Sequence, residues 1–189
     1  MKPLFASVLA LGLATPVLAI DAAAALDAFV DDNVMGWALS PPVIDAIKAQ
    51  NAEHAGLTQD DIDALDATWR AEIGSTDMPT VSSVVDNATS AFLREQVAAQ
   101  NGAITEAFIM DNRGLNVAAS GATSDYWQGD EDKFNATFGV GPEGRHFSEI
   151  EKDESTQTYQ AQASFAIADP DTGEVIGAMT VGIDAAALQ

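Results

Sequence analysis

The sequence predicts an α+β fold, with a central antiparallel sheet of about five strands and N-terminal helices packed on one face of that sheet. A change of hydrophobic period carries this prediction. Apolar residues recur every three to four positions as far as Asn101, whereas beyond Gly102 they alternate with polar residues. We therefore divide the chain into a signal peptide (residues 1–19), a helical segment (residues 20–101) and a sheet-forming domain (residues 102–189).

The first nineteen residues have the layout of a secretory signal peptide. Lys2 supplies a positive start, an apolar run extends from Leu4 to Leu18, and Val17-Leu18-Ala19 is a small-residue cleavage pattern. The run contains Pro16 and is shorter than the roughly twenty residues that a membrane-spanning helix needs. We expect cleavage after Ala19 and a periplasmic location, in preference to a retained anchor.

Three or four amphipathic helices are expected before Gly102. One covers the apolar positions 26–37, and the pattern restarts after Pro41-Pro42, because proline suits a first helical turn. Another begins at Thr58 with a pattern that resembles a capping box. The last runs from residue 81 to the stop at Asn101-Gly102.

Beyond Gly102, alternating residues and turn signals predict five strands. They are expected at residues 104–111, 115–119, 146–150, 159–167 and 175–183. Asp111–Gly114 and Asp169–Gly173 are the turns of two hairpins, and a short helix is expected at residues 131–138. Small residues on both faces of the last two strands indicate a sheet that is covered on both sides.

Composition excludes several classes of partner. The chain has 29 acidic and eight basic residues, a net charge of −21. Such a surface repels phosphate backbones and anionic lipids, so we expect no nucleic-acid partner. With no cysteine there is neither a disulfide nor a thiolate metal site. No other apolar stretch approaches membrane length, so we expect a separate membrane partner to carry any signal.

Three segments resemble the extracytoplasmic Cache (PDC) sensor domains of bacterial receptors, which have a PAS-like fold. They are Phe108–Ala118, Thr123–Glu131, and Asp169–Gly173 followed by Val175–Ile183. The resemblance implies a small organic solute held between the sheet and the loops after the second strand, with Asp125 to Asp130 gripping it. Family members usually sit between two membrane helices and drive an output domain; from this sequence we expect neither the second membrane helix nor the output domain. It also lacks the arginine that precedes the aromatic pair in amino-acid-binding members, which argues against an α-amino acid ligand.

Six residues are candidates for ligand binding: Asp125, Tyr126, Trp127, Asp130, Arg145 and Tyr159. Aromatic faces beside carboxylates suit an organic cation; in the alternative, Trp127 caps the hydrophobic core and the aspartates face water. The planar fork of Arg145 suits a carboxylate ligand, or else forms a surface ion pair. Tyr159 lines a cavity or belongs to the core.

No catalytic motif is present, and the two histidines have no metal-ligand spacing. The sequence therefore predicts a non-enzymatic sensor module without cofactor or metal. It binds an organic cation or a small carboxylate and reports to a membrane sensor kinase or receptor. One alternative is a structural or interaction protein whose pocket is filled by its own side chains, with the N-terminal helices as a homodimer surface. A hydrolase with a carboxylate-lined cleft is a third.

Overall fold

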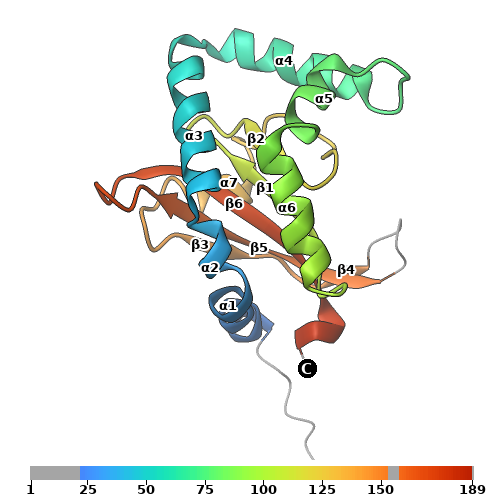
Figure 1. Ribbon diagram of the computed structural model, residues 1–189, viewed down its shortest axis with the longest axis vertical. Helices are drawn as coiled ribbons and strands as arrows, with labels where there is room; N and C mark the ends of the chain where they lie inside the picture. The colour runs from blue at the N-terminus through green and yellow to red at the C-terminus, as the bar shows by residue number, and fades with distance from the viewer. Residues whose placement is uncertain (1–21, 153–157, 189) are drawn as a thin grey trace, which may run out of the picture.

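The computed structural model describes residues 22–152 and 158–188. The predicted signal peptide lies outside the described residues. Figure 1 shows the arrangement of the rest: α3 and α6 cross the front of the sheet, and α4 and α5 lie across one end of it.

Six α-helices precede the sheet within residues 22–152, more than the three or four expected. They are α1 (Ala22–Asn33), α2 (Met35–Ala38), α3 (Pro41–Glu53), α4 (Gln59–Glu72), α5 (Pro79–Val85) and α6 (Ala88–Ala99), with a 3-10 turn η1 (His54–Gly56) after α3. The first expected helix is interrupted at Val34, between α1 and α2. The last is divided because the side chain of Asn87 accepts a hydrogen bond from the Ser90 N–H, at 2.8 Å, and so begins a new helix.

The predicted capping box at the start of α4 is confirmed. The Asp61 N–H donates to Thr58 Oγ1, and the Thr58 N–H donates to Asp61 Oδ2. Hydrogen bonds that the Thr58 hydroxyl, at 2.6 Å, and the Thr58 N–H donate to Asp61 Oδ2 hold the pKa of the Asp61 carboxyl below its usual value. The helix that follows buries Ile62 and Trp69 on its inner side.

The described strands form one antiparallel sheet with the order β2-β1-β6-β5-β3, and β4 also pairs with β5. The strands are β1 (Ile104–Met110), β2 (Asn116–Ala119), β3 (Arg145–Phe147), β4 (Glu151–Lys152), β5 (Tyr159–Ala168) and β6 (Val175–Asp184). Both predicted hairpins are present. The helix expected at residues 131–138 is shorter, α7 (Asp132–Asn135), and a 3-10 turn η2 (Ala185–Leu188) follows β6.

Alternate residues of the strands enter two separate cores. Ala107 and Ile109 of β1 pack in a cluster with α1, α2, α3 and α6. Their neighbour Phe108 packs in a second cluster with Trp69 of α4 and residues of α5. This alternation follows from the two-residue period of a strand, and the expectation of a sheet covered on both sides is confirmed.

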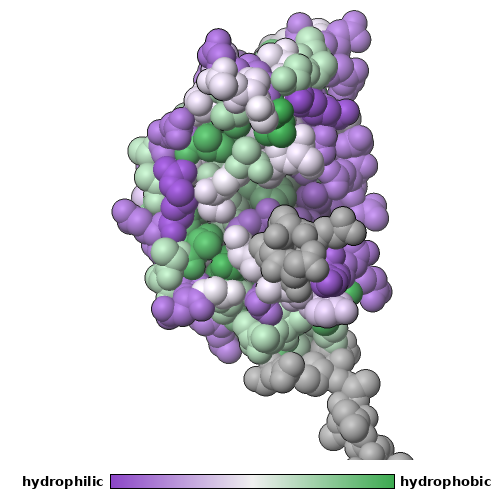
Figure 2. Space-filling model, turned by 90° about the vertical axis from the view of Figure 1, so that its right-hand side faces the viewer, coloured by the Kyte–Doolittle hydropathy of each residue, from purple (hydrophilic) through white to green (hydrophobic). Residues whose placement is uncertain are grey.

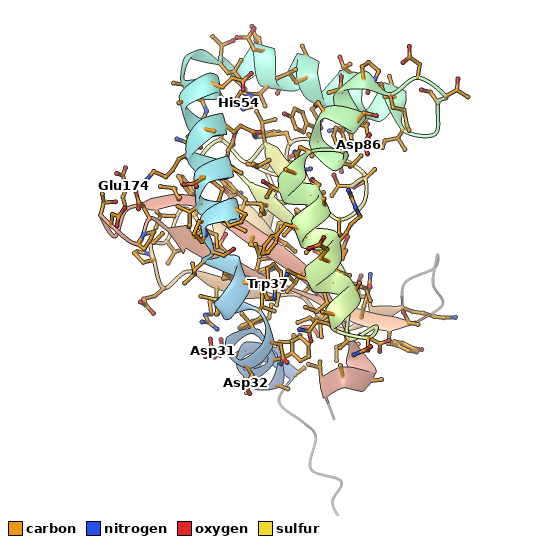
Figure 3. The ribbon with its side chains drawn as sticks, in the orientation of Figure 1. Asp31, Asp32, Trp37, His54, Asp86 and Glu174 are labelled. Atoms are coloured by element: carbon orange, nitrogen blue, oxygen red, sulfur yellow. The ribbon has the colours of Figure 1, made fainter. Side chains whose placement is uncertain are left out.

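Polar contacts fasten the end of α3 to the turns of the sheet. Asp111, which is fully buried, accepts hydrogen bonds from Gln50 Nε2 at 3.0 Å and contacts His54 Nδ1 at 2.8 Å. Lys48 Nζ contacts Asp169 Oδ2 at 2.8 Å. Figure 3 shows His54 at the end of α3 where the chain turns towards α4. Helix and turns are therefore held together by buried polar groups as well as by apolar packing.

Among the described residues, no helix combines the length and the hydropathy that crossing a bilayer requires. Figure 2 shows hydrophilic residues over much of the visible face, with hydrophobic residues in separate patches.

Candidate functional site

The candidate site is built around the segment that follows β2, residues 123–131, which we call the roof segment. A carboxylate from α4 holds it: Asp66 Oδ1 accepts hydrogen bonds from the Tyr126 N–H at 2.9 Å and from the Trp127 N–H at 3.1 Å. Asp66 is only 4% exposed. A buried carboxylate needs such donors. These two hydrogen bonds therefore hold the roof segment against α4, although sixty residues separate Asp66 from Tyr126.

Tyr126 points into the protein. Its ring stacks on that of Trp69, with centroids 5.2 Å apart and planes 8° apart, and Tyr126 is only 6% exposed. Burial, with smaller contributions from the charges of Asp111 and Glu53, raises the pKa of Tyr126 to about 12. The two stacked rings lie between α4 and the roof segment, so Tyr126 contributes to the packing of these two elements.

Trp127, the next residue, is half-buried and packs against the same hydrophobic cluster as Tyr126. Its Nε1–H donates to the Arg113 carbonyl at 2.8 Å, and its backbone forms an antiparallel bridge with Leu115. The indole borders an open groove of about 250 Å³, which we call the Trp127 groove. The groove is lined by Asp63, Asp66, Ala67, Arg70, Trp127 and Asp130.

The lining of the Trp127 groove is predominantly negative. Three carboxylates, those of Asp63, Asp66 and Asp130, face a single cation, Arg70. Arg70 forms ion pairs with Asp66 and, through Nε at 2.8 Å, with Asp125 Oδ1. Among the hydrogen bonds and ion pairs of the described residues, none involves the side chain of Asp130. An indole beside unneutralised carboxylates attracts a cation by its ring quadrupole and by charge.

Two of the six predicted residues lie elsewhere. Arg145 Nη1 and Nη2 contact Asp27 and Asp31 of α1 at 2.5 and 2.7 Å, which is the ion-pair interpretation of this residue. Figure 3 shows Asp31 near the end of the molecule opposite to His54. Tyr159 is 59% exposed at the start of β5 and borders a different depression, of about 510 Å³, together with Ile150. The structure therefore does not bring Arg145 or Tyr159 to the Trp127 groove.

Four residues that line the Trp127 groove were not predicted from the sequence, and all four belong to α4. Asp63, Asp66, Ala67 and Arg70 recur at spacings of three and four, so they share one side of the helix. That stripe was visible in the sequence. Its pairing with the roof segment was not, because it depends on a contact between distant parts of the chain. Among the described residues, no group of three His, Cys, Asp or Glu side chains is placed to hold a metal ion.

No family model matches the chain, and no curated protein matches its sequence. Solved structures do match. The sensory domain of the Campylobacter jejuni chemoreceptor Tlp3 with isoleucine bound is 13% identical, with a TM-score of 0.40, over 88% of this chain and 64% of that one. The sensor domain of the Vibrio cholerae histidine kinase DctB is 9% identical, with a TM-score of 0.39, over 88% and 56%.

A third match is the ligand-binding domain of the Pseudomonas aeruginosa amino acid chemoreceptor PctC in complex with GABA. It is 11% identical, with a TM-score of 0.41, over 76% of this chain and 58% of that one. The chain thus spans about three fifths of the length of these domains. What each domain binds is a property of that protein. The fold of this chain resembles extracytoplasmic ligand-binding sensor domains of chemoreceptors and of a histidine kinase.

Proposed function

We propose that this chain is a periplasmic sensor module that binds a small organic cation in the Trp127 groove and reports it to a separate membrane partner. In this role the protein binds its ligand without transforming it. The observation that carries the proposal is the lining of the groove, where an indole stands beside three carboxylates. One of them, that of Asp130, has no hydrogen bond or ion pair among the described residues. The small-carboxylate alternative is less favourable, because an anion would meet this excess of negative charge.

The size of the groove limits the ligand and its affinity. A volume of about 250 Å³ is slightly below the range of roughly 300–1,000 Å³ that is common for small-molecule sites. It suits a cation of the size of tetramethylammonium or choline. A cation over an indole gains about 0.5–2 kcal/mol from the ring, and the charge attraction of an open groove weakens as salt is added. We therefore expect affinities in the micromolar to millimolar range.

The groove also provides a route for signalling. Its walls come from two elements, α4 on one side and the roof segment on the other. A ligand that binds one relative position of these elements better than another shifts the population towards that position. The change that a partner would detect is a shift of α4, which lies across one end of the sheet (Figure 1).

Calorimetric titration with choline at low ionic strength tests the proposal. We expect saturable binding that weakens as salt is added and is reduced several-fold by Asp130→Asn. Because no described contact of the folded chain uses the Asp130 side chain, this substitution leaves the fold intact. Asp132→Asn is the matched control: it removes the same charge two residues away, from a side chain that does not line the Trp127 groove.

Three results would overturn this proposal. The first is the absence of choline binding at millimolar concentration. The second is an equal loss of affinity in Asp130→Asn and Asp132→Asn, which would mean that only the net charge matters. The third is preferential binding of a small carboxylate such as acetate in a parallel titration.

The export part of the proposal has its own test. The full chain is produced in a Gram-negative host with a C-terminal tag, and the periplasmic fraction is collected. We expect the purified protein to begin at Ile20, the residue after the predicted cleavage site. Recovery of a chain that begins at Met1 from the cytoplasm or the membrane would contradict export by cleavage.

One observation favours a second function, that of an interaction protein with a self-filled pocket. The stacked rings of Trp69 and Tyr126 occupy the space beneath the roof segment. If the stacked rings serve only to fill this space and the protein acts as an interaction protein, none of the cations tested will bind, and light scattering will find a stable dimer. The two functions are therefore separated by the same purified sample.

A further inference from the structure

We infer that Arg70 is a built-in competitor for the ligand of the Trp127 groove, so that the groove selects guanidinium-type cations and binding removes one of the contacts that join α4 to the roof segment. The inference rests on the proposed function and deepens it in two respects. It gives the ligand a narrower chemical class, and it gives the site a means of regulation.

The contacts of Arg70 define a subsite for a guanidinium group. One carboxylate, Asp66, belongs to α4, and the other, Asp125, belongs to the roof segment; the guanidinium contacts both, through Nη2 and Nε respectively. Carboxylates placed around the planar fork of a guanidinium fit its N–H groups better than they fit a spherical cation. The chain therefore already holds, in this groove, a cation of the class that we assign to the ligand.

Arg70 is placed so that a ligand can displace it. Its side chain is 58% exposed, whereas that of Asp66 is 6% exposed. The cation thus lies at the mouth of the groove and the carboxylate beneath it. Ion pairs that are open to solvent contribute little to stability. The contacts of Arg70 are therefore weak enough for a soluble guanidinium to replace them, although Arg70 has the advantage of being part of the chain.

Displacement would change how α4 is attached. Asp66 Oδ1 keeps its hydrogen bonds from the Tyr126 and Trp127 N–H groups, because these lie on the buried side. Trp69 Nε1–H, also on α4, keeps its hydrogen bond to the Thr123 carbonyl at 2.9 Å. The ion pair between Arg70 and Asp125 is the third polar attachment of α4 to the roof segment. A free guanidinium that takes the place of Arg70 neutralises the same carboxylates without joining the two elements. Ligand binding thus removes one of these three polar attachments and leaves the other two.

Calorimetric titration with methylguanidinium, far below denaturing concentrations, tests the inference in wild type, Arg70→Gln and Arg70→Lys. A subsite that Arg70 occupies about nine-tenths of the time lowers the apparent affinity about tenfold. We therefore expect Arg70→Gln to bind methylguanidinium about tenfold more tightly than wild type. Arg70→Lys is expected to fall between them, because an ammonium group lacks the fork. Tetramethylammonium, which has no N–H donors, is expected to gain less from Arg70→Gln.

Arg94→Gln is the matched control for net charge. Arg94 lies on α6 and donates to the Val85 carbonyl, outside the groove, so this variant is expected to bind methylguanidinium as wild type does. An equal gain in Arg94→Gln would overturn the inference, since it would show a general effect of charge.

The remaining outcomes separate this inference from the proposed function. If wild type binds cations and Arg70→Gln binds methylguanidinium no more tightly, Arg70 is not a competitor, and the proposed function stands alone. If none of the three proteins binds either cation, both fail. If Arg70→Gln does not fold, Arg70→Lys decides, and an affinity for methylguanidinium at or below that of wild type overturns the inference.

Discussion

Asp66 should be the residue on which the attachment of α4 depends most. Replacing it by alanine leaves two backbone N–H groups, those of Tyr126 and Trp127, without their acceptor. A buried donor without a partner costs about 1–3 kcal/mol. Because the adjoining groove admits water to one side, we expect Asp66→Ala to lower the free energy of unfolding by about 2–4 kcal/mol, a large part of the roughly 5–15 kcal/mol typical of a domain.

Asp66→Asn separates the hydrogen bonds from the charge. Asparagine keeps an acceptor oxygen for both N–H groups and loses only the charge that pairs with the exposed Arg70. Exposed pairs contribute at most about 1 kcal/mol, so we expect Asp66→Asn to cost about that amount. Asp63→Ala, on the same helix and exposed, is the control and is expected to stay within about 0.5 kcal/mol of wild type.

Urea unfolding followed by circular dichroism and by tryptophan fluorescence measures these differences. The slope with urea should be unchanged, so that the midpoints report stability alone. The reasoning is refuted if Asp66→Ala loses less than about 1 kcal/mol, or if asparagine and alanine lose equal amounts. Either result would show that the hydrogen bonds to the roof segment do not hold it in place.

Three further predictions concern the same fold. Gly114→Ala should lower the free energy of unfolding in urea by about 2–4 kcal/mol. The reason is that Gly114 has φ of 82° and that an added Cβ would lie 2.6 Å from the backbone of the roof segment. Gly121→Ala, with open space around it, should be nearly neutral. The phenol of Tyr126 stays neutral in the folded protein up to about pH 12 but ionises near pH 10 in the unfolded chain. The free energy of unfolding should therefore fall by about 2–3 kcal/mol between these pH values. Tyr126→Phe should abolish this dependence on pH. The hydrogen bond from Lys48 holds the pKa of Asp169 below its usual value, so the pair stabilises the fold only while Asp169 is ionised; the difference in unfolding free energy between wild type and Lys48→Met should therefore shrink as the pH falls from 6 to 3.

The elements that the sequence predicts well are those with local causes. The change of period at Gly102 and the turn residues at Asp169–Gly173 depend on a few neighbours, and the structure confirms both. The split of the last helix was missed because the capping side chain of Asn87 outweighs a hydrophobic pattern that continues through it. Local patterns are thus reliable for the type of an element and less so for its ends.

The candidate site was predicted only in part, for a physical reason. The aromatic pair and Asp130 were recognised from their composition, because aromatics are unusual in a polar segment. The placement of Tyr126 and Trp127 beside α4 depends on a buried contact with Asp66, sixty residues away in the chain. No pattern within the roof segment records that contact, so the contribution of α4 to the groove became evident only from the structure.

The borders of the sheet have a consequence for how copies of the protein behave at high concentration. The outer side of β5 is occupied along its length by short partners: β4, the Ser148 side chain, β3 and the Gly144 carbonyl. The other border, β2, has only four residues. The edges of the sheet are therefore short strands, which offer few backbone groups to a strand from a neighbouring molecule. Together with the mutual repulsion of chains that carry a net charge of −21, these short edges are expected to oppose fibrous association in a crowded sample.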